Sequence, residues 1–97
     1  MIKIVCSMTV KADKIEEFKA AAKELVEKSN AEEGNVSYSL NQSTTDTQKF
    51  AMLEVWKDQK AIDIHNASEH FNRILPIIGA MCEGSPEIAL YNEVEYN

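Results

Sequence analysis

Two histidines, His65 and His70, are the side chains of this sequence best suited to proton transfer near neutral pH. The ordinary pKa of imidazole lies close to neutrality, so a histidine acts as a general base without a large shift. We interpret His65 as a candidate base at the edge of an apolar pocket. The alternative, equally open from sequence, is a buried or cap-associated histidine that is hydrogen-bonded to the backbone.

Four further residues are predicted to surround this base. His70 is expected in the first turn of a helix, where the helix dipole disfavours protonation; it is either a second catalytic group or a surface or capping residue. Trp56 is either an aromatic wall for a flat substrate or plain core. Tyr38 either donates a hydrogen bond to a substrate oxygen or is a half-buried strand tyrosine. Phe71 completes the predicted substrate-binding group.

Other kinds of chemistry find no support in the sequence. It contains no nucleotide-binding loop, no metal-ligand cluster and no Ser-His-Asp order. The two cysteines, Cys6 and Cys82, have no further cysteine or nearby histidine to complete a tetrahedral zinc site. We therefore predict no metal and no cofactor, and we expect both thiols to be free.

Length and charge restrict the class of protein. The 97 residues form one domain, 1–97, because chains divide into separate cores only when they are much longer. Sixteen acidic residues outnumber ten basic ones, giving a net charge of -6, and the basic residues are scattered. Nucleic acid and anionic membrane are therefore not expected as partners. Without a signal-peptide core or an apolar span, we expect a cytoplasmic protein.

Hydrophobic periodicity predicts the elements that position these residues. Period-two alternation indicates four strands, and apolar stripes at helical spacing indicate helices. The first helix is predicted from Asp13, as its N-cap, to Asn30; Asp58 and Ser68 are predicted to cap two further short helices. Pro76 is expected to bend or break the last helix. The predicted strands are 2–10, 36–41, 49–56 and 87–96, the last one following Gly84 and Pro86.

The order of elements predicts the architecture. A β-α-β-β-α-β order corresponds to an α+β, ferredoxin-like fold, a four-stranded antiparallel sheet with helices on one face. The third predicted strand carries large apolar residues on both parities, for example Trp56 on one side and Leu53 on the other. A strand with this pattern is buried on both faces. We therefore predict a homodimer in which two sheets pack face to face.

Three segments resemble one known family. They are Glu-Glu-Gly-Asn-Val-Ser-Tyr-Ser-Leu at 32–40, the stretch from Leu53-Glu54-Val55-Trp56 to His65, and Ser68-Glu69-His70-Phe71. Together they resemble the antibiotic-biosynthesis-monooxygenase-like family, whose fold is a dimeric α/β barrel. The family contains cofactor-independent monooxygenases that oxidise phenols or quinols, and haem-degrading enzymes that use an asparagine on the first strand. Here that strand offers Ser7 and Thr9 instead.

The resemblance implies a cofactor-independent monooxygenase that oxidises a quinol or another phenolic small molecule with molecular oxygen. In that hypothesis His65 deprotonates the substrate. Two alternatives remain. One is an isomerase of a small phosphorylated autoinducer-type sugar, for which only Lys49, Lys57, Lys60 and Arg73 are near enough in sequence to bind phosphate. The other is a small-molecule-binding stress protein without turnover.

Overall fold

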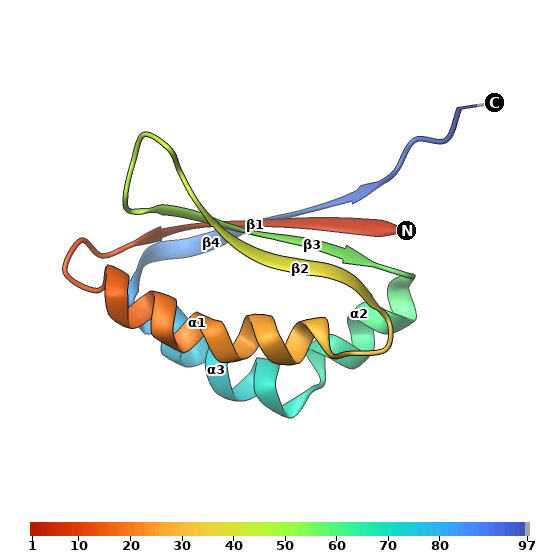
Figure 1. Ribbon diagram of the computed structural model, residues 1–97, viewed down its shortest axis with the longest axis horizontal. Coiled ribbons are helices and arrows are strands. Elements are labelled where there is room, and N and C mark those ends of the chain that lie inside the picture. Colours follow the sequence, from red (N-terminus) through yellow and green to blue (C-terminus); the bar gives the residue numbers. More distant parts are fainter. Residues whose placement is uncertain (97) are drawn as a thin grey trace.

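The computed structural model describes residues 1–96. These residues form a four-stranded sheet and helices that cover one face of the sheet (Figure 1). The strand order is β2-β3-β1-β4, and each neighbouring pair is antiparallel. The predicted ferredoxin-like α+β fold is therefore confirmed. The elements are β1 (Ile2–Val10), α1 (Ile15–Asn30), β2 (Asn35–Gln42), β3 (Lys49–Trp56), α2 (Gln59–Asn66), α3 (Glu69–Ala80) and β4 (Cys82–Asn92).

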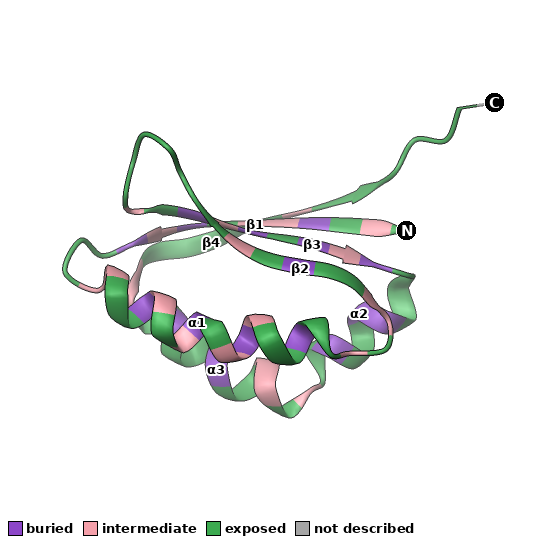
Figure 2. Cartoon of the chain, viewed as in Figure 1, coloured by how far each residue is buried: buried purple, intermediate pink, exposed green. Residues whose placement is uncertain are grey.

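The core lies between the sheet and the helices, where Figure 2 shows most of the buried residues. Because strand side chains alternate, one parity of β3 faces the helices. Phe50, Met52, Glu54 and Trp56 share this parity and are all buried, whereas Leu53 on the outer face is 43% exposed. The buried face of β3 thus carries one acidic residue within an otherwise apolar row.

The start of α1 differs from the prediction. The helix begins at Ile15, and its N-cap position is Lys14, which makes no side-chain capping hydrogen bond. The backbone N–H of Lys14 donates to the carbonyl of Lys11 at 2.9 Å, which closes a turn around Asp13. Asp13 therefore lies inside this turn, and its predicted role as N-cap is wrong.

The second helical region is split as predicted, at Ala67 and Ser68. Asp58 and Ser68 are confirmed as the caps of α2 and α3, because their side chains accept the backbone N–H groups of Ala61 and Phe71. A break at Pro76 does not occur, since α3 continues to Ala80. Pro76 lies on the exposed side of the helix, where water can replace the lost hydrogen bond. No helix within residues 1–96 has the length and apolar character needed to cross a bilayer.

The last strand is longer at its start than predicted. β4 begins at Cys82, so Gly84 and Pro86 lie inside the strand and not in a preceding turn. It ends at Asn92, so the predicted end at residue 96 is wrong. Its register against β1 shifts between the pairs Thr9–Glu83 and Ser7–Glu87. Gly84 has a φ of 66° at this bulge, a conformation that glycine adopts readily. As an edge strand, β4 also tolerates a proline without an N–H.

Candidate functional site

An apolar cavity of about 600 Å³ lies between the sheet and helices α2 and α3. This volume is within the range of small-molecule sites, roughly 300–1,000 Å³. Exposed apolar side chains of β4 and α3, Ile88, Leu90 and Leu75, contribute to its lining. Two buried residues whose imidazole and carboxyl groups can accept or donate a proton, His65 and Glu54, also line the cavity. The cavity therefore combines an apolar wall with two groups that can exchange protons.

The carboxylate of Glu32 joins both histidines. Its Oε2 atom lies 2.6 Å from Nδ1 of His65 and 2.9 Å from Nε2 of His70. An ionised carboxylate only accepts hydrogen bonds, so each imidazole donates an N–H to it. The three side chains come from the turn after α1, the end of α2 and the first turn of α3. This Glu32–His65–His70 cluster is largely shielded from solvent, with 13%, 2% and 14% of the side chains exposed.

Two features position the cluster: the close contact of Gly34 with α2, and the hydrogen bonds of the Ser68 hydroxyl between α2 and α3. Gly34 lies so close to α2 that a Cβ atom at this position would approach the Cβ of Ala61 to 2.4 Å. Only glycine therefore lets the turn carrying Glu32 rest on the helix carrying His65. The Ser68 hydroxyl donates to the carbonyl of His65 at 2.6 Å and accepts the N–H of Phe71 at 3.2 Å. It ties the end of α2 to the start of α3.

His65 is held in one protonation state by these contacts. Burial lowers the pKa of its imidazole, and the hydrogen bond with Glu32 opposes this effect only in part. The neutral ring is thus favoured, with its proton on Nδ1 facing Glu32. The other nitrogen, Nε2, is buried and has no hydrogen-bonding partner among the described residues. A neutral imidazole with a free lone pair beside a cavity is the arrangement expected of a general base.

Aromatic rings enclose the imidazole of His65. Its centroid lies 4.5 Å from the indole of Trp56, 4.8 Å from the ring of Phe71 and 5.6 Å from that of Tyr38. The centroid of His70 is 5.9 Å away. The structure therefore brings all five predicted site residues together.

Their positions around the cavity differ. His65, Tyr38 and Phe71 line it, whereas Trp56 is fully buried behind its wall and is not among the lining residues. His70 is also outside the lining and faces Glu32. The packing places Trp56 behind His65 as a support, and not at the cavity surface as an aromatic wall would require.

Two acidic residues of the site, Glu32 and Glu54, were not predicted as functional. Glu32 could have been suspected only from a family motif, because it is 33 positions from His65 and lies in a turn. Glu54 left a clearer signal, since it interrupts the apolar parity of β3. In the structure it is 7% exposed and its Oε1 atom accepts the indole N–H of Trp56 at 2.9 Å.

The Glu32–His65–His70 cluster also offers three possible metal ligands within 4.8 Å of one another. Two ligands bound at about 2.0–2.2 Å to a tetrahedral ion lie about 3.3–3.6 Å apart. The 2.6 Å between His65 and Glu32 is shorter and corresponds to a charge-assisted hydrogen bond. As placed, the cluster is a hydrogen-bonded group, and an ion would require the carboxylate to move away from His65.

Comparisons with known proteins agree with this fold. The family described as antibiotic biosynthesis monooxygenase matches residues 1–76. A Bacillus subtilis protein named "Putative monooxygenase YcnE" is 44% identical over 71 residues, which cover 73% of this chain and 75% of that protein.

Two solved structures are similar over almost their whole length. One is described as an antibiotic biosynthesis monooxygenase; its TM-score is 0.93 at 33% identity, and the match covers 98% of this chain and 100% of that one. The other, a conserved protein from Methanosarcina mazei Go1, also has a TM-score of 0.93 at 33% identity, covering 96% and 92% of the two chains. These matches support a monooxygenase-type function, and the chain belongs to the antibiotic biosynthesis monooxygenase family.

Proposed function

We propose that this chain is a cofactor-independent monooxygenase that oxidises a quinol or another phenolic small molecule with molecular oxygen. The observation that carries the proposal is His65 in the wall of the apolar cavity, with its buried Nε2 atom lacking a hydrogen-bonding partner among the described residues and Glu32 bonded to the opposite nitrogen. A hydroxylated aromatic ring matches this combination of an apolar surface and one proton acceptor.

In this mechanism the base makes the substrate reactive toward oxygen. Dioxygen in its triplet ground state reacts slowly with closed-shell molecules, and a phenolate gives up electrons more easily than a phenol. Nε2 of His65 takes the hydroxyl proton, and the Glu32 carboxylate stabilises the imidazolium that forms, through the hydrogen bond to Nδ1. One oxygen atom then enters the substrate ring, and the other leaves as water with two hydrogen atoms from the substrate, which is thereby oxidised to a quinone. Tyr38 and Phe71 contribute aromatic surface to the pocket.

Oxygen uptake with reduced menadiol tests the proposal. The native protein should consume oxygen faster than the spontaneous reaction, and His65→Ala should lose most of this rate, about 100-fold, as expected for a general base. Asp63→Ala, an exposed change on the same helix, is the matched control. Isotopically heavy oxygen in the product separates ring oxygenation from simple oxidation to the quinone. Equal rates for the native protein and His65→Ala would remove His65 from the mechanism.

The two other functions remain testable in the same cavity. Its described lining contains no lysine or arginine, so nothing there favours a sugar phosphate. A binding protein without turnover would be stabilised by quinones or phenols in a thermal-shift screen, because any ligand of the native state raises the melting temperature. Stabilisation without oxygen uptake would favour that function over ours.

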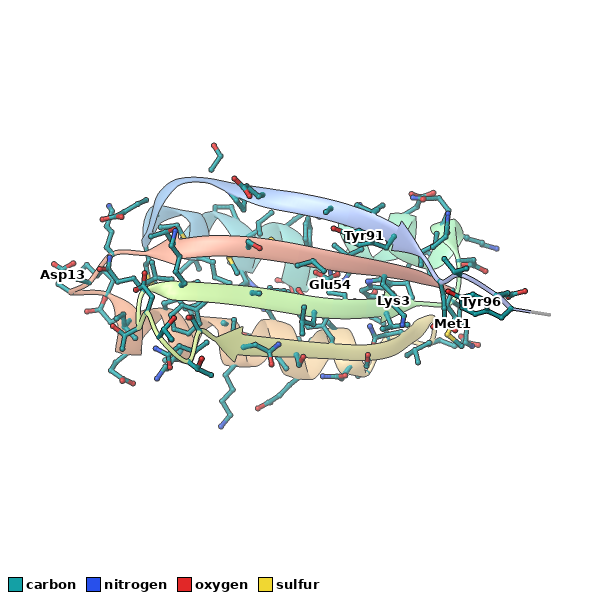
Figure 3. The ribbon with its side chains drawn as sticks, turned by 90° about the horizontal axis from the view of Figure 1, so that it is seen from above. Met1, Lys3, Asp13, Glu54, Tyr91 and Tyr96 are labelled. Atoms are coloured by element: carbon teal, nitrogen blue, oxygen red, sulfur yellow. The ribbon has the colours of Figure 1, made fainter. Side chains whose placement is uncertain are left out.

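We further propose that two copies of the chain pair through the outer face of the sheet. We also propose that the protein is cytoplasmic, a compartment in which Cys6 and Cys82 would remain free thiols. Figure 3 looks onto this face, with Tyr91 at one end of β4. Leu53 and Tyr91 lie there 43% and 56% exposed. Leu53→Lys should convert a dimer into a monomer in size-exclusion chromatography with light scattering, whereas Ala20→Lys on exposed α1 should not. A native monomer at micromolar concentration would contradict the pairing.

A further inference from the structure

Glu54 is a carboxyl group that the fold buries without a charged partner. It lies in the middle of the sheet (Figure 3) and is flanked in register by Ile4 of β1 and Tyr38 of β2. Its only hydrogen bond with a described residue is the one that Oε1 accepts from Trp56. Burying a carboxyl group with one neutral hydrogen bond is costly, so the fold alone does not account for a glutamate here.

The second oxygen of Glu54, Oε2, is left for the cavity. Glu54 lines the cavity, and Oε2 has no hydrogen-bonding partner among residues 1–96. Burial raises the pKa of this carboxyl group, as does the nearby Glu32, and the hydrogen bond from Trp56 opposes the rise. Burial thus shifts this carboxyl group toward its protonated form. In that form Oε1, which accepts the indole N–H, is the carbonyl oxygen, and the hydroxyl is at Oε2.

We propose that Glu54 is the second ligand-binding group of the cavity and donates a hydrogen bond from Oε2 to a ligand oxygen. His65 supplies the complementary contact, because its free Nε2 accepts a hydrogen bond from a ligand hydroxyl. Both residues touch the same indole, Glu54 at its N–H and His65 on its ring. The inference rests on the proposed function, in that the ligand is a hydroxylated aromatic compound.

This pair of groups defines the ligand more narrowly than the cavity alone. One acceptor and one donor fit an aromatic ring that carries a hydroxyl and a second oxygen able to accept a hydrogen bond. Quinols, their monoethers and hydroxylated aromatic ketones share this pattern. A simple alkylphenol lacks it and would leave the buried carboxyl donor without a partner, which costs binding energy.

Two naphthols of similar shape and hydroxyl acidity test the inference. They are 4-methoxy-1-naphthol, which has the second oxygen, and 4-ethyl-1-naphthol, which has a methylene in its place. Dissociation constants are measured by calorimetry without oxygen, and the indole N–H resonance of Trp56, the only tryptophan in the sequence, reports binding at this cavity by NMR. The native protein should bind the methoxy compound about tenfold more tightly. Equal constants, or tighter binding of the ethyl compound, would overturn the proposal.

Two substitutions assign the preference to residue 54. Glu54→Gln keeps an oxygen for the Trp56 N–H and an N–H donor for the ligand, so most of the preference should remain. Glu54→Met should reduce it to about twofold or less while both naphthols still bind. A full preference in Glu54→Met, or none in a folded Glu54→Gln, would contradict the assignment. If the methionine variant does not fold, Glu54→Leu, which also lacks a donor, takes its place.

The binding measurement is independent of turnover. A protein that shows the preference but consumes no oxygen would refute the proposed oxidation and leave the role of Glu54 intact. A protein that consumes oxygen but binds both naphthols equally would refute the role of Glu54 alone.

Discussion

Replacing Glu32 by alanine should destabilise the protein strongly, because one carboxylate satisfies two shielded imidazoles. A hydrogen bond to a charged group contributes about 1.5–3 kcal/mol. We assign the hydrogen bond to His65 a contribution in the upper part of this range, since that ring is almost completely buried. The hydrogen bond to His70 is partly exposed to solvent and contributes less. We expect Glu32→Ala to lower the free energy of unfolding by about 3 kcal/mol, which for a domain of this size lowers the melting temperature by roughly 12–24 °C.

Urea unfolding at pH 7.5, followed by circular dichroism, measures this loss. Glu32→Gln keeps the shape of the side chain and an accepting oxygen but removes the charge, so its loss should be about half as large. Glu33→Ala is the matched control, because Glu33 is the exposed neighbour in the same turn and should change stability by less than about 0.5 kcal/mol. If Glu32→Ala and Glu33→Ala were equally stable, the two histidines would not depend on the carboxylate as the geometry indicates.

Two more predictions follow from burial and packing. Because the pKa of His65 is lowered in the native state, the unfolded chain binds the proton first, so the free energy of unfolding should fall as pH decreases through about 6.5; an NMR titration in which the His65 imidazole protonates at or above that value would contradict this. Gly34→Ala should cost about 1–3 kcal/mol in urea unfolding, because its Cβ would meet Ala61, whereas Gly79→Ala, with nothing within 4 Å, should stabilise α3 by up to about 1 kcal/mol. A harmless Gly34→Ala would show that the turn has room to move.

The element order and the position of the histidines could be predicted because they depend on local patterns. The alternation from Ile2 to Val10 and the caps Asp58 and Ser68 act over a few residues, and the structure confirms them. The boundaries of β4 could not be predicted in this way. Gly84 and Pro86 normally mark a turn, and only the pairing with β1 shows that they form a bulge within an edge strand.

The two acidic residues show a different limit of sequence reasoning. The bond between Glu32 and His65 depends on the packing of a turn against α2, which Gly34 permits, and no periodicity reveals such a contact. Glu54 was visible as the acidic member of an apolar parity. A period-two pattern shows which side chains share a face of the sheet. It does not show whether the helices fill the space next to that face or leave a cavity, and only beside a cavity can Glu54 bind a ligand.

A single physical cause connects His65 with Glu54. Removing water from the surroundings disfavours the charged form of any group, so the same burial lowers the pKa of the imidazole and raises that of the carboxyl group. Both residues are thereby shifted toward their neutral forms, in which the imidazole accepts a proton and the carboxyl group donates a hydrogen bond. An ion pair between them would abolish both functions, because the proton would move from Glu54 to His65. The apolar wall of the cavity therefore does more than hold a flat ligand: it shifts the pKa values of the two polar groups in the directions that binding and proton abstraction require.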